Sequence, residues 1–139
     1  MIEEYEKIYY EANSFLQAAS MLHGEENILY GWFNPVLYPI IVNISFSCEL
    51  FIKCLLAKNK VPTKGHNLKE LFDELDNEQR QQIKTLTKEN DFDIVLKNHS
   101  DFFVKYRYVY EKDNKITNVN LSFMFAFANS LKDTIKEIL

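Results

Sequence analysis

The stretch NISFSCELFIKCLLAKNK, residues 43–60, is apolar on most sides when it is wound as a helix. Asn34 and Pro35 precede it, and this pair is typical of an N-cap followed by the first helical position. We therefore expect one helix from Pro35 to about Asn59, and we expect it to be the most buried element of the fold. Glu49 lies in the middle of it and needs a partner, because burying an unpaired carboxylate is costly.

Two amphipathic segments outside this stretch predict two further long helices. Apolar residues recur at helical spacing over residues 2–23, and again from Leu121 to Ile138. The chain has only three Gly and three Pro, so few residues interrupt helices. These features favour an all-α protein.

The middle of the chain predicts three further helices. Asn67, with Glu70 three residues later, has the spacing of a capping box and starts the first. The second begins at Asp76 or Asn77 and ends near Lys88. The third begins at Asn90 or Asp91 and carries one long apolar stripe, formed by Phe92, Val95, Leu96, His99, Phe102, Phe103, Tyr106 and Tyr110. The predicted fold is an up-and-down antiparallel bundle with two long core helices and a short helix pair between them.

The composition indicates one domain over residues 1–139 and excludes several classes of protein. The longest uncharged apolar run, Pro35 to Cys48, is too short to cross a bilayer, and the acidic N-terminus is unlike a secretory signal. Cys48 and Cys54 fall on nearly opposite sides of one helix, so we expect free thiols in a cytoplasmic protein. No Cys, His and carboxylate cluster has metal-site spacing, and we expect no metal and no cofactor.

The net charge of −4 conceals a segregation of charge. Residues 50–69 contain five lysines and no acid, whereas residues 70–78 contain five acids and no lysine. The ordinary interpretation is a solvated loop beside a solvated helix. The alternative is a local patch that attracts phosphate.

Two histidines come into question as functional groups. His99 lies in the apolar stripe, where a histidine is ordinarily a hydrogen-bonded core residue. His66 precedes the Asn67 cap and is interpreted as a turn residue. The sequence shows no nucleophile-and-base motif and no glycine-rich phosphate loop.

Three motifs follow one another along the chain: SCELFIKCLL at 47–56, KGHNLKELF at 64–72 and FFVKYRYVYE at 102–111. Together they resemble the HEPN domain (higher eukaryotes and prokaryotes nucleotide-binding), whose prokaryotic members have a Glu-x-x-x-Lys-x-Leu-Leu helix, a Gly-His-x-Leu turn and an Arg-Tyr-x-Tyr-Glu segment. The resemblance implies an antiparallel helical bundle, commonly dimeric, of toxin–antitoxin, antiphage or RNA-processing systems. It also implies a nucleotidyltransferase or antitoxin as a partner.

Active HEPN ribonucleases are metal-independent and use an Arg-x(4–6)-His motif, which is absent after Arg107 in this sequence. The resemblance therefore implies nucleotide or RNA binding without catalysis, and Lys53, His66, Lys105 and Arg107 are the candidate ligand-binding residues. The alternative is a ribonuclease that uses His99, Arg107 and Glu49 across a dimer cleft.

Two structural expectations complete the sequence analysis. Arg107 flanks the apolar stripe, and a bidentate Glu49–Arg107 ion pair would satisfy the buried carboxylate. Phe123 and Phe127 are four residues apart and lie off the stripe assigned to the core, so we expect them to form a two-fold dimer contact. The other interpretation places both rings under the loop of residues 24–36.

Overall fold

The computed structural model describes residues 1–25, 37–107 and 119–139, and these form an all-α bundle, as the sequence predicts. The helices are α1 (Glu4–Glu25), α2 (Leu37–Lys58), α3 (Leu68–Asp73), α4 (Asn77–Thr87), α5 (Phe92–Asn98), α6 (Phe102–Arg107) and α7 (Leu121–Lys136). The proposed N-cap at Asn34 and Pro35 lies outside the described residues.

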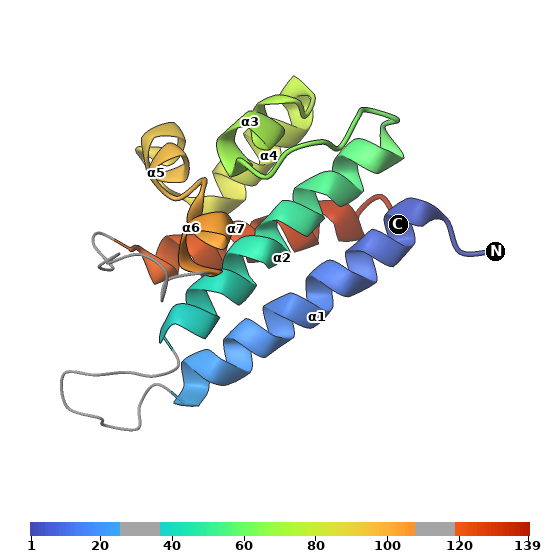
Figure 1. The fold of residues 1–139 in the computed structure, drawn as a ribbon. Helices are drawn as coiled ribbons and strands as arrows, with labels where there is room; N and C mark the ends of the chain where they lie inside the picture. The colour runs from blue at the N-terminus through green and yellow to red at the C-terminus, as the bar shows by residue number, and fades with distance from the viewer. Residues whose placement is uncertain (26–36, 108–118) are drawn as a thin grey trace.

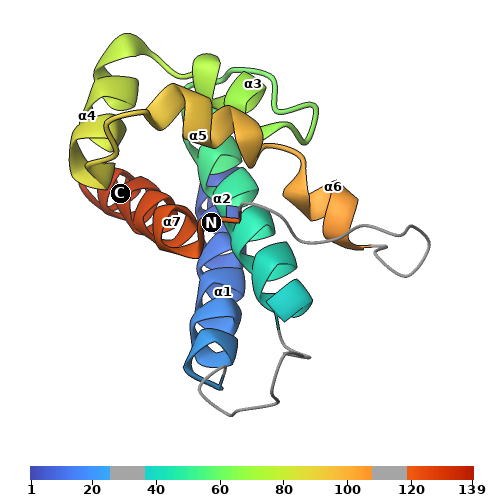
Figure 2. The ribbon, with the colours of Figure 1, turned by 90° about the vertical axis from the view of Figure 1, so that its left-hand side faces the viewer.

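Helix α2 is the centre of the bundle. The long helix α1 runs antiparallel beside it, α7 packs against another side, and α6 crosses it (Figures 1 and 2). The short helices α3, α4 and α5 cover the side that faces away from α1 (Figure 1). Twelve of the residues of α2 are buried, which confirms that it is the main core helix.

Helix α2 ends within a residue of the predicted end, and its length bears on the expectation that no segment of the chain can cross a bilayer. Its 22 residues are long and apolar enough to cross a membrane by length and composition alone. Of its most apolar window, 67% is buried within the fold, as in the core helix of a soluble protein. Packing against α1, α6 and α7 thus accounts for the apolar character of this helix.

The predicted N-caps of the short helices are confirmed. The Asn67 side chain accepts a hydrogen bond from the backbone N–H of Glu70, 3.0 Å away, at the start of α3. The Asp76 carboxylate accepts one from the N–H of Gln79 at 2.7 Å and starts α4. Helix α4 ends at Thr87, and its C-cap Lys88 takes a left-handed conformation with φ of 60°.

The caps of α4 and α5 provide a matched test. Asp76 caps α4 through a hydrogen bond, whereas Asp91, at the same position of α5, makes no side-chain capping hydrogen bond. We expect Asp76→Ala to lower the free energy of unfolding by about 1 kcal/mol and Asp91→Ala by less than half of that. Urea denaturation of both variants checks this, and equal losses would contradict it.

The prediction of one long helix from residue 90 to residue 110 is wrong for its described part. The chain leaves the helix at His99 and starts again as α6 at Phe102. Ser100 explains the break, because its carbonyl accepts the N–H of Leu68 and its hydroxyl accepts the N–H of Lys69. Ser100 thus provides acceptors for the first N–H groups of α3. It could not do so if its carbonyl were bonded within one continuous helix from α5 to α6.

The placement predicted for Phe123 and Phe127 is also wrong. Both rings are buried inside the chain's own core, with 3% and 0% of their surface exposed. They stack on each other, and both contact the ring of Phe92 from α5. The short helices therefore cover the face that was expected to be open to a second copy.

Candidate functional site

The candidate site is a cluster around the carboxylate of Glu49, on the fourth turn of α2. Glu49 is only 1% exposed. Its Oε2 atom lies 3.1 Å from the Nζ of Lys53, one turn further along the same helix. The same oxygen lies 3.1 Å from the Nδ1 of His66, in the turn before α3. Residues from the first two sequence motifs therefore meet at one buried oxygen.

The turn between α2 and α3 places His66. Gly65 has a φ of 100°, a conformation that residues with a side chain rarely adopt, and Asn67 then starts the helix. Because an ionised carboxylate only accepts hydrogen bonds, the Nδ1 of His66 is the donor. The imidazole is 59% exposed, so its remaining nitrogen is available to solvent or to a ligand.

Three polar atoms of α2 and α6 are buried and make no hydrogen bond within the described part of the chain. They are the Oε1 of Glu49, the Oγ of Ser45 and the hydroxyl of Tyr106. The first two lie one turn apart on α2, and the third lies on α6, which packs against α2. An unsatisfied buried polar group is unfavourable, so a water molecule or a further side chain is expected beside each of these atoms.

The third motif lies on α6. Phe103 stacks on Phe46 of α2 with a centroid distance of 4.5 Å, and Tyr106 belongs to a second small core with Ile41 and Phe102. The Nζ of Lys105 lies 5.3 Å from the centre of the Tyr106 ring. The side chain of Arg107 lies outside the described residues, so the Glu49–Arg107 ion pair stays a prediction.

The lysine-rich stretch is partly neutralised by acids. The Nζ of Lys69 lies 2.6 Å from an oxygen of Asp73 and 3.5 Å from one of Asp93. Lys58 lies over the ring of Tyr5, at 4.4 Å from its centre. With Lys53 bound to Glu49, the stretch offers less positive charge to a ligand than its sequence indicates.

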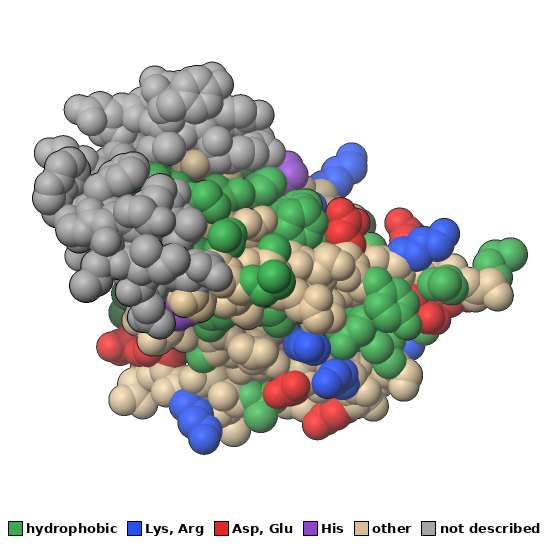
Figure 3. Space-filling model, turned by 90° about the horizontal axis from the view of Figure 1, so that it is seen from below, with side chains coloured by type: hydrophobic (Ala, Val, Ile, Leu, Met, Phe, Trp, Pro, Cys, Tyr) green, Lys and Arg blue, Asp and Glu red, His purple; other side chains and the backbone are tan. Residues whose placement is uncertain are grey.

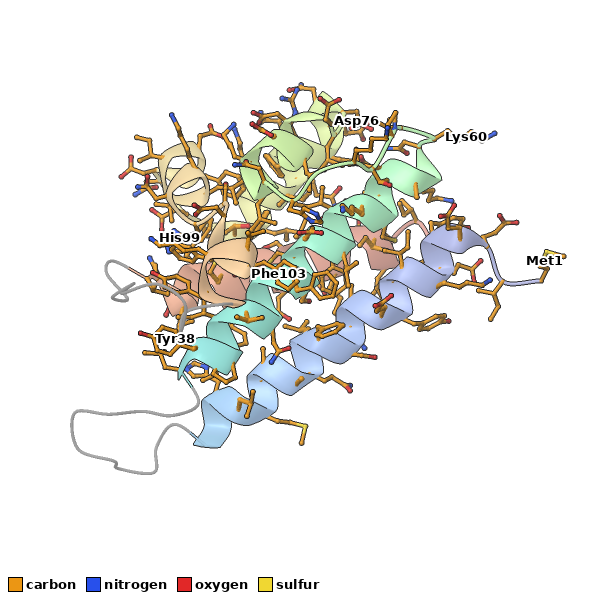
Figure 4. The ribbon with its side chains drawn as sticks, in the orientation of Figure 1. Met1, Tyr38, Lys60, Asp76, His99 and Phe103 are labelled. Atoms are coloured by element: carbon orange, nitrogen blue, oxygen red, sulfur yellow. The ribbon has the colours of Figure 1, made fainter. Side chains whose placement is uncertain are left out.

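His99 holds three segments together and is not open to solvent. It is 3% exposed, and its imidazole ring packs against the rings of Phe102 and Phe123. Its Nδ1 donates to the carbonyl of Val95, and its Nε2 accepts the N–H of Asn120, both at 2.8 Å. Figure 4 shows His99 at the junction of α5 and α6. Burial lowers the pKa of His99, and the hydrogen bond to Val95 acts in the opposite direction.

The catalytic alternative requires an exposed His99, and this requirement is not met. Both ring nitrogens of His99 already have backbone partners, so neither is available to take a proton from a substrate. The residue instead joins the end of α5 to Asn120, the N-cap of α7.

A hollow of about 260 Å³ adjoins the turn between α2 and α3 and is lined by Pro62, Lys64, Gly65, Asn67, Glu70, Leu71 and Glu74. Its lining includes neither His66 nor Lys53, and its charges are mixed. We find no group of three or more potential metal ligands among residues 1–25, 37–107 and 119–139.

Comparison with protein-family models, with curated proteins and with solved structures finds no match to this chain. The fold and the site define an all-α helical-bundle protein with a buried carboxylate that holds an exposed histidine. The resemblance to HEPN domains rests on the three motifs alone.

Proposed function

We propose that this protein is a HEPN-like nucleotide- or RNA-binding domain that contacts phosphate through His66 and Lys53. The observation that carries the proposal is the meeting of two motifs at Glu49, which fixes the imidazole of His66 with most of its surface in solvent. A carboxylate that accepts from Nδ1 orients the ring and leaves its second nitrogen for a ligand. Lys53 lies beside it, and although its Nζ pairs with Glu49, the remaining N–H groups of the ammonium can donate to a phosphate.

The proposed domain binds without cutting RNA. Its sequence lacks the histidine that follows the arginine in active HEPN ribonucleases, and His99 is engaged by backbone groups. The proposal also includes a cytoplasmic location, a homodimer, and a toxin–antitoxin or antiphage setting with a nucleotidyltransferase or antitoxin as partner. These parts rest on the resemblance of the motifs.

Binding to a labelled single-stranded RNA, measured by fluorescence anisotropy over a series of salt concentrations, tests the proposal. Few phosphate contacts on a net-negative protein give weak affinity, with a dissociation constant of about 10⁻⁴ to 10⁻⁶ M. We expect Lys53→Met and His66→Ala each to weaken binding, and Lys53→Met to reduce the salt slope by about 1.

Lys97→Met is the matched control, because Lys97 is an exposed lysine of α5 and should leave both quantities unchanged. Equal affinities for the wild type, Lys53→Met and His66→Ala would contradict the proposal. Intact RNA after incubation with the protein in EDTA is expected. Cleavage that His99→Ala abolishes would instead support the ribonuclease alternative.

A further inference from the structure

The hydrogen bond between Glu49 and His66 fixes which nitrogen of the imidazole carries the hydrogen. An ionised carboxylate only accepts hydrogen bonds, so the Nδ1 of His66, 3.1 Å from the Oε2 of Glu49, is the donor. In a neutral imidazole one nitrogen donates and the other accepts. The Nε2 of His66 therefore presents a lone pair, on a side chain that is 59% exposed.

Lys53 has the opposite hydrogen-bonding character and lies beside this acceptor. Its Nζ and the Nδ1 of His66 each lie 3.1 Å from the same oxygen of Glu49, so the two groups are neighbours. The side chain of Lys53 is 16% exposed, and its ammonium group has N–H groups beyond the one that faces Glu49. An acceptor and a cationic donor therefore lie side by side at this site.

Phosphate alone does not match this pair of groups. A phosphate oxygen is an acceptor, so it binds the ammonium of Lys53 but not the lone pair on the Nε2 of a neutral His66. Within a strand, the sugar–phosphate backbone of RNA has one hydrogen-bond donor, the ribose 2′-hydroxyl, and that of DNA has none. The 2′-hydroxyl is attached to the carbon next to the one that bears the 3′-phosphate. A ribonucleotide therefore supplies a donor and an anion as neighbours.

We propose that this pair of residues distinguishes ribose from deoxyribose, with the Nε2 of His66 accepting a hydrogen bond from a 2′-hydroxyl and Lys53 contacting the adjacent phosphate. The inference rests on the proposed function, because it needs RNA to bind at this site. It also refines that function, since the contact of a neutral His66 moves from the phosphate to the sugar that bears it. His66 is then the residue that determines specificity for RNA.

The surface charge of the protein favours only weak general attraction to a nucleic acid. Seen from below, the molecule shows scattered Lys and Arg side chains with Asp and Glu near most of them (Figure 3). The net charge of the chain is −4. Because the attraction to phosphate does not depend on the sugar and is weak here, one additional hydrogen bond should be a measurable share of the binding free energy.

Three short oligomers of uridine, with ribose, deoxyribose or 2′-fluororibose as the sugar, test the proposal. All three carry the same bases and phosphates, and only the ribose oligomer has a 2′-hydroxyl proton to donate. Fluorescence anisotropy at one salt concentration and at pH 8, where a histidine is ordinarily neutral, should show about fivefold tighter binding of the ribose oligomer, as expected for one net hydrogen bond.

The wild-type protein alone decides between the outcomes. Binding of all three oligomers with equal affinity would overturn the sugar contact and leave RNA binding intact. Binding of the 2′-fluoro oligomer as tightly as the ribose oligomer would also overturn it, because fluorine donates no hydrogen bond. Binding of none of them would overturn the proposed function together with this inference.

Two variants then assign the contacts within the site. His66→Ala should bring the three affinities together, because it removes the acceptor for the 2′-hydroxyl. Lys53→Met should weaken all three alike and keep their ratio, because a phosphate contact does not depend on the sugar. Circular dichroism confirms that both variants are folded. A preference for ribose that survives His66→Ala, with all three affinities lowered together, would show a purely structural His66 and overturn the assignment.

Discussion

Replacing Lys53 and His66 together is expected to lower the free energy of unfolding by about 3–5 kcal/mol, the usual cost of leaving a buried charge without its partners. Both side chains bind the same oxygen of Glu49, which is 1% exposed. In the double variant Lys53→Met, His66→Ala, the methionine keeps the apolar stem, so the loss reports the charge and not the packing. Urea denaturation monitored by circular dichroism gives the value.

A third substitution, Glu49→Gln, separates the cost of the unpaired charge from general damage to the fold. Adding Glu49→Gln to the double variant removes the charge that has lost its partners, and most of the lost stability should return. Lys97→Met, on the exposed side of α5, is the control and should change stability by less than about 0.5 kcal/mol. A double variant that loses less than about 1 kcal/mol would contradict the assignment of both partners. Arg107→Ala, compared with Lys105→Ala, would then test the remaining candidate partner of Glu49.

The central helix and the caps could be predicted from the sequence because their signals are local. A helix that is apolar on most sides has to be buried, and α2 is. Asn67 and Asp76 carry their capping signal within three residues, and both side chains accept the expected hydrogen bond. The all-α class follows from the same local patterns.

The helix break at His99 could not be predicted in the same way. The apolar periodicity continues through the break, and the groups that compete with the helix come from elsewhere in the chain. Ser100 binds the start of α3, some thirty residues earlier in the sequence, and His99 binds Asn120 at the start of α7. The spacing of apolar residues along the sequence carries no information about such tertiary hydrogen bonds.

The partner of Glu49 illustrates the same limit. The sequence shows that a buried carboxylate needs a donor, and Lys53 one turn away was a visible candidate. His66 was interpreted as a turn residue, because the turn between α2 and α3 had to be placed before its side chain could be paired with Glu49. The sequence does carry one relevant signal, because Gly65 precedes His66 and glycine is the residue that most readily takes a positive φ, here 100°.

Lowering the pH is expected to destabilise this protein through His99. Burial holds the pKa of His99 below its usual value, whereas the unfolded chain keeps a value of about 6.5. Between these two values the unfolded state binds more protons than the folded state, so stability rises with pH. The contribution is fully present above about pH 6.5 and declines below it, by at most about 1.4 kcal/mol per pH unit for one proton.

The mechanism follows from the hydrogen bonds. A protonated imidazole donates from both nitrogens, so its Nε2 can no longer accept the N–H of Asn120, and the start of α7 loses its link to α5. Among the described residues, the neighbours of the buried ring are Phe102, Phe123 and two backbone groups. The hydrogen bond to the carbonyl of Val95 favours the charged form, but burial outweighs it.

His99→Gln isolates the contribution of His99 to the pH dependence. The variant should unfold with a smaller dependence on pH between pH 5 and about 7, because it has no group that titrates at this position. His99→Ala should cost about 3 kcal/mol at neutral pH, since it removes a packed ring together with both hydrogen bonds. Added salt should leave the difference between wild type and His99→Gln largely unchanged, because a buried group is screened little. If the free energy of unfolding varied with pH in the same way for wild type and His99→Gln, the prediction would be contradicted. The hydrogen bond from Asn120 to His99 would then not be lost on protonation.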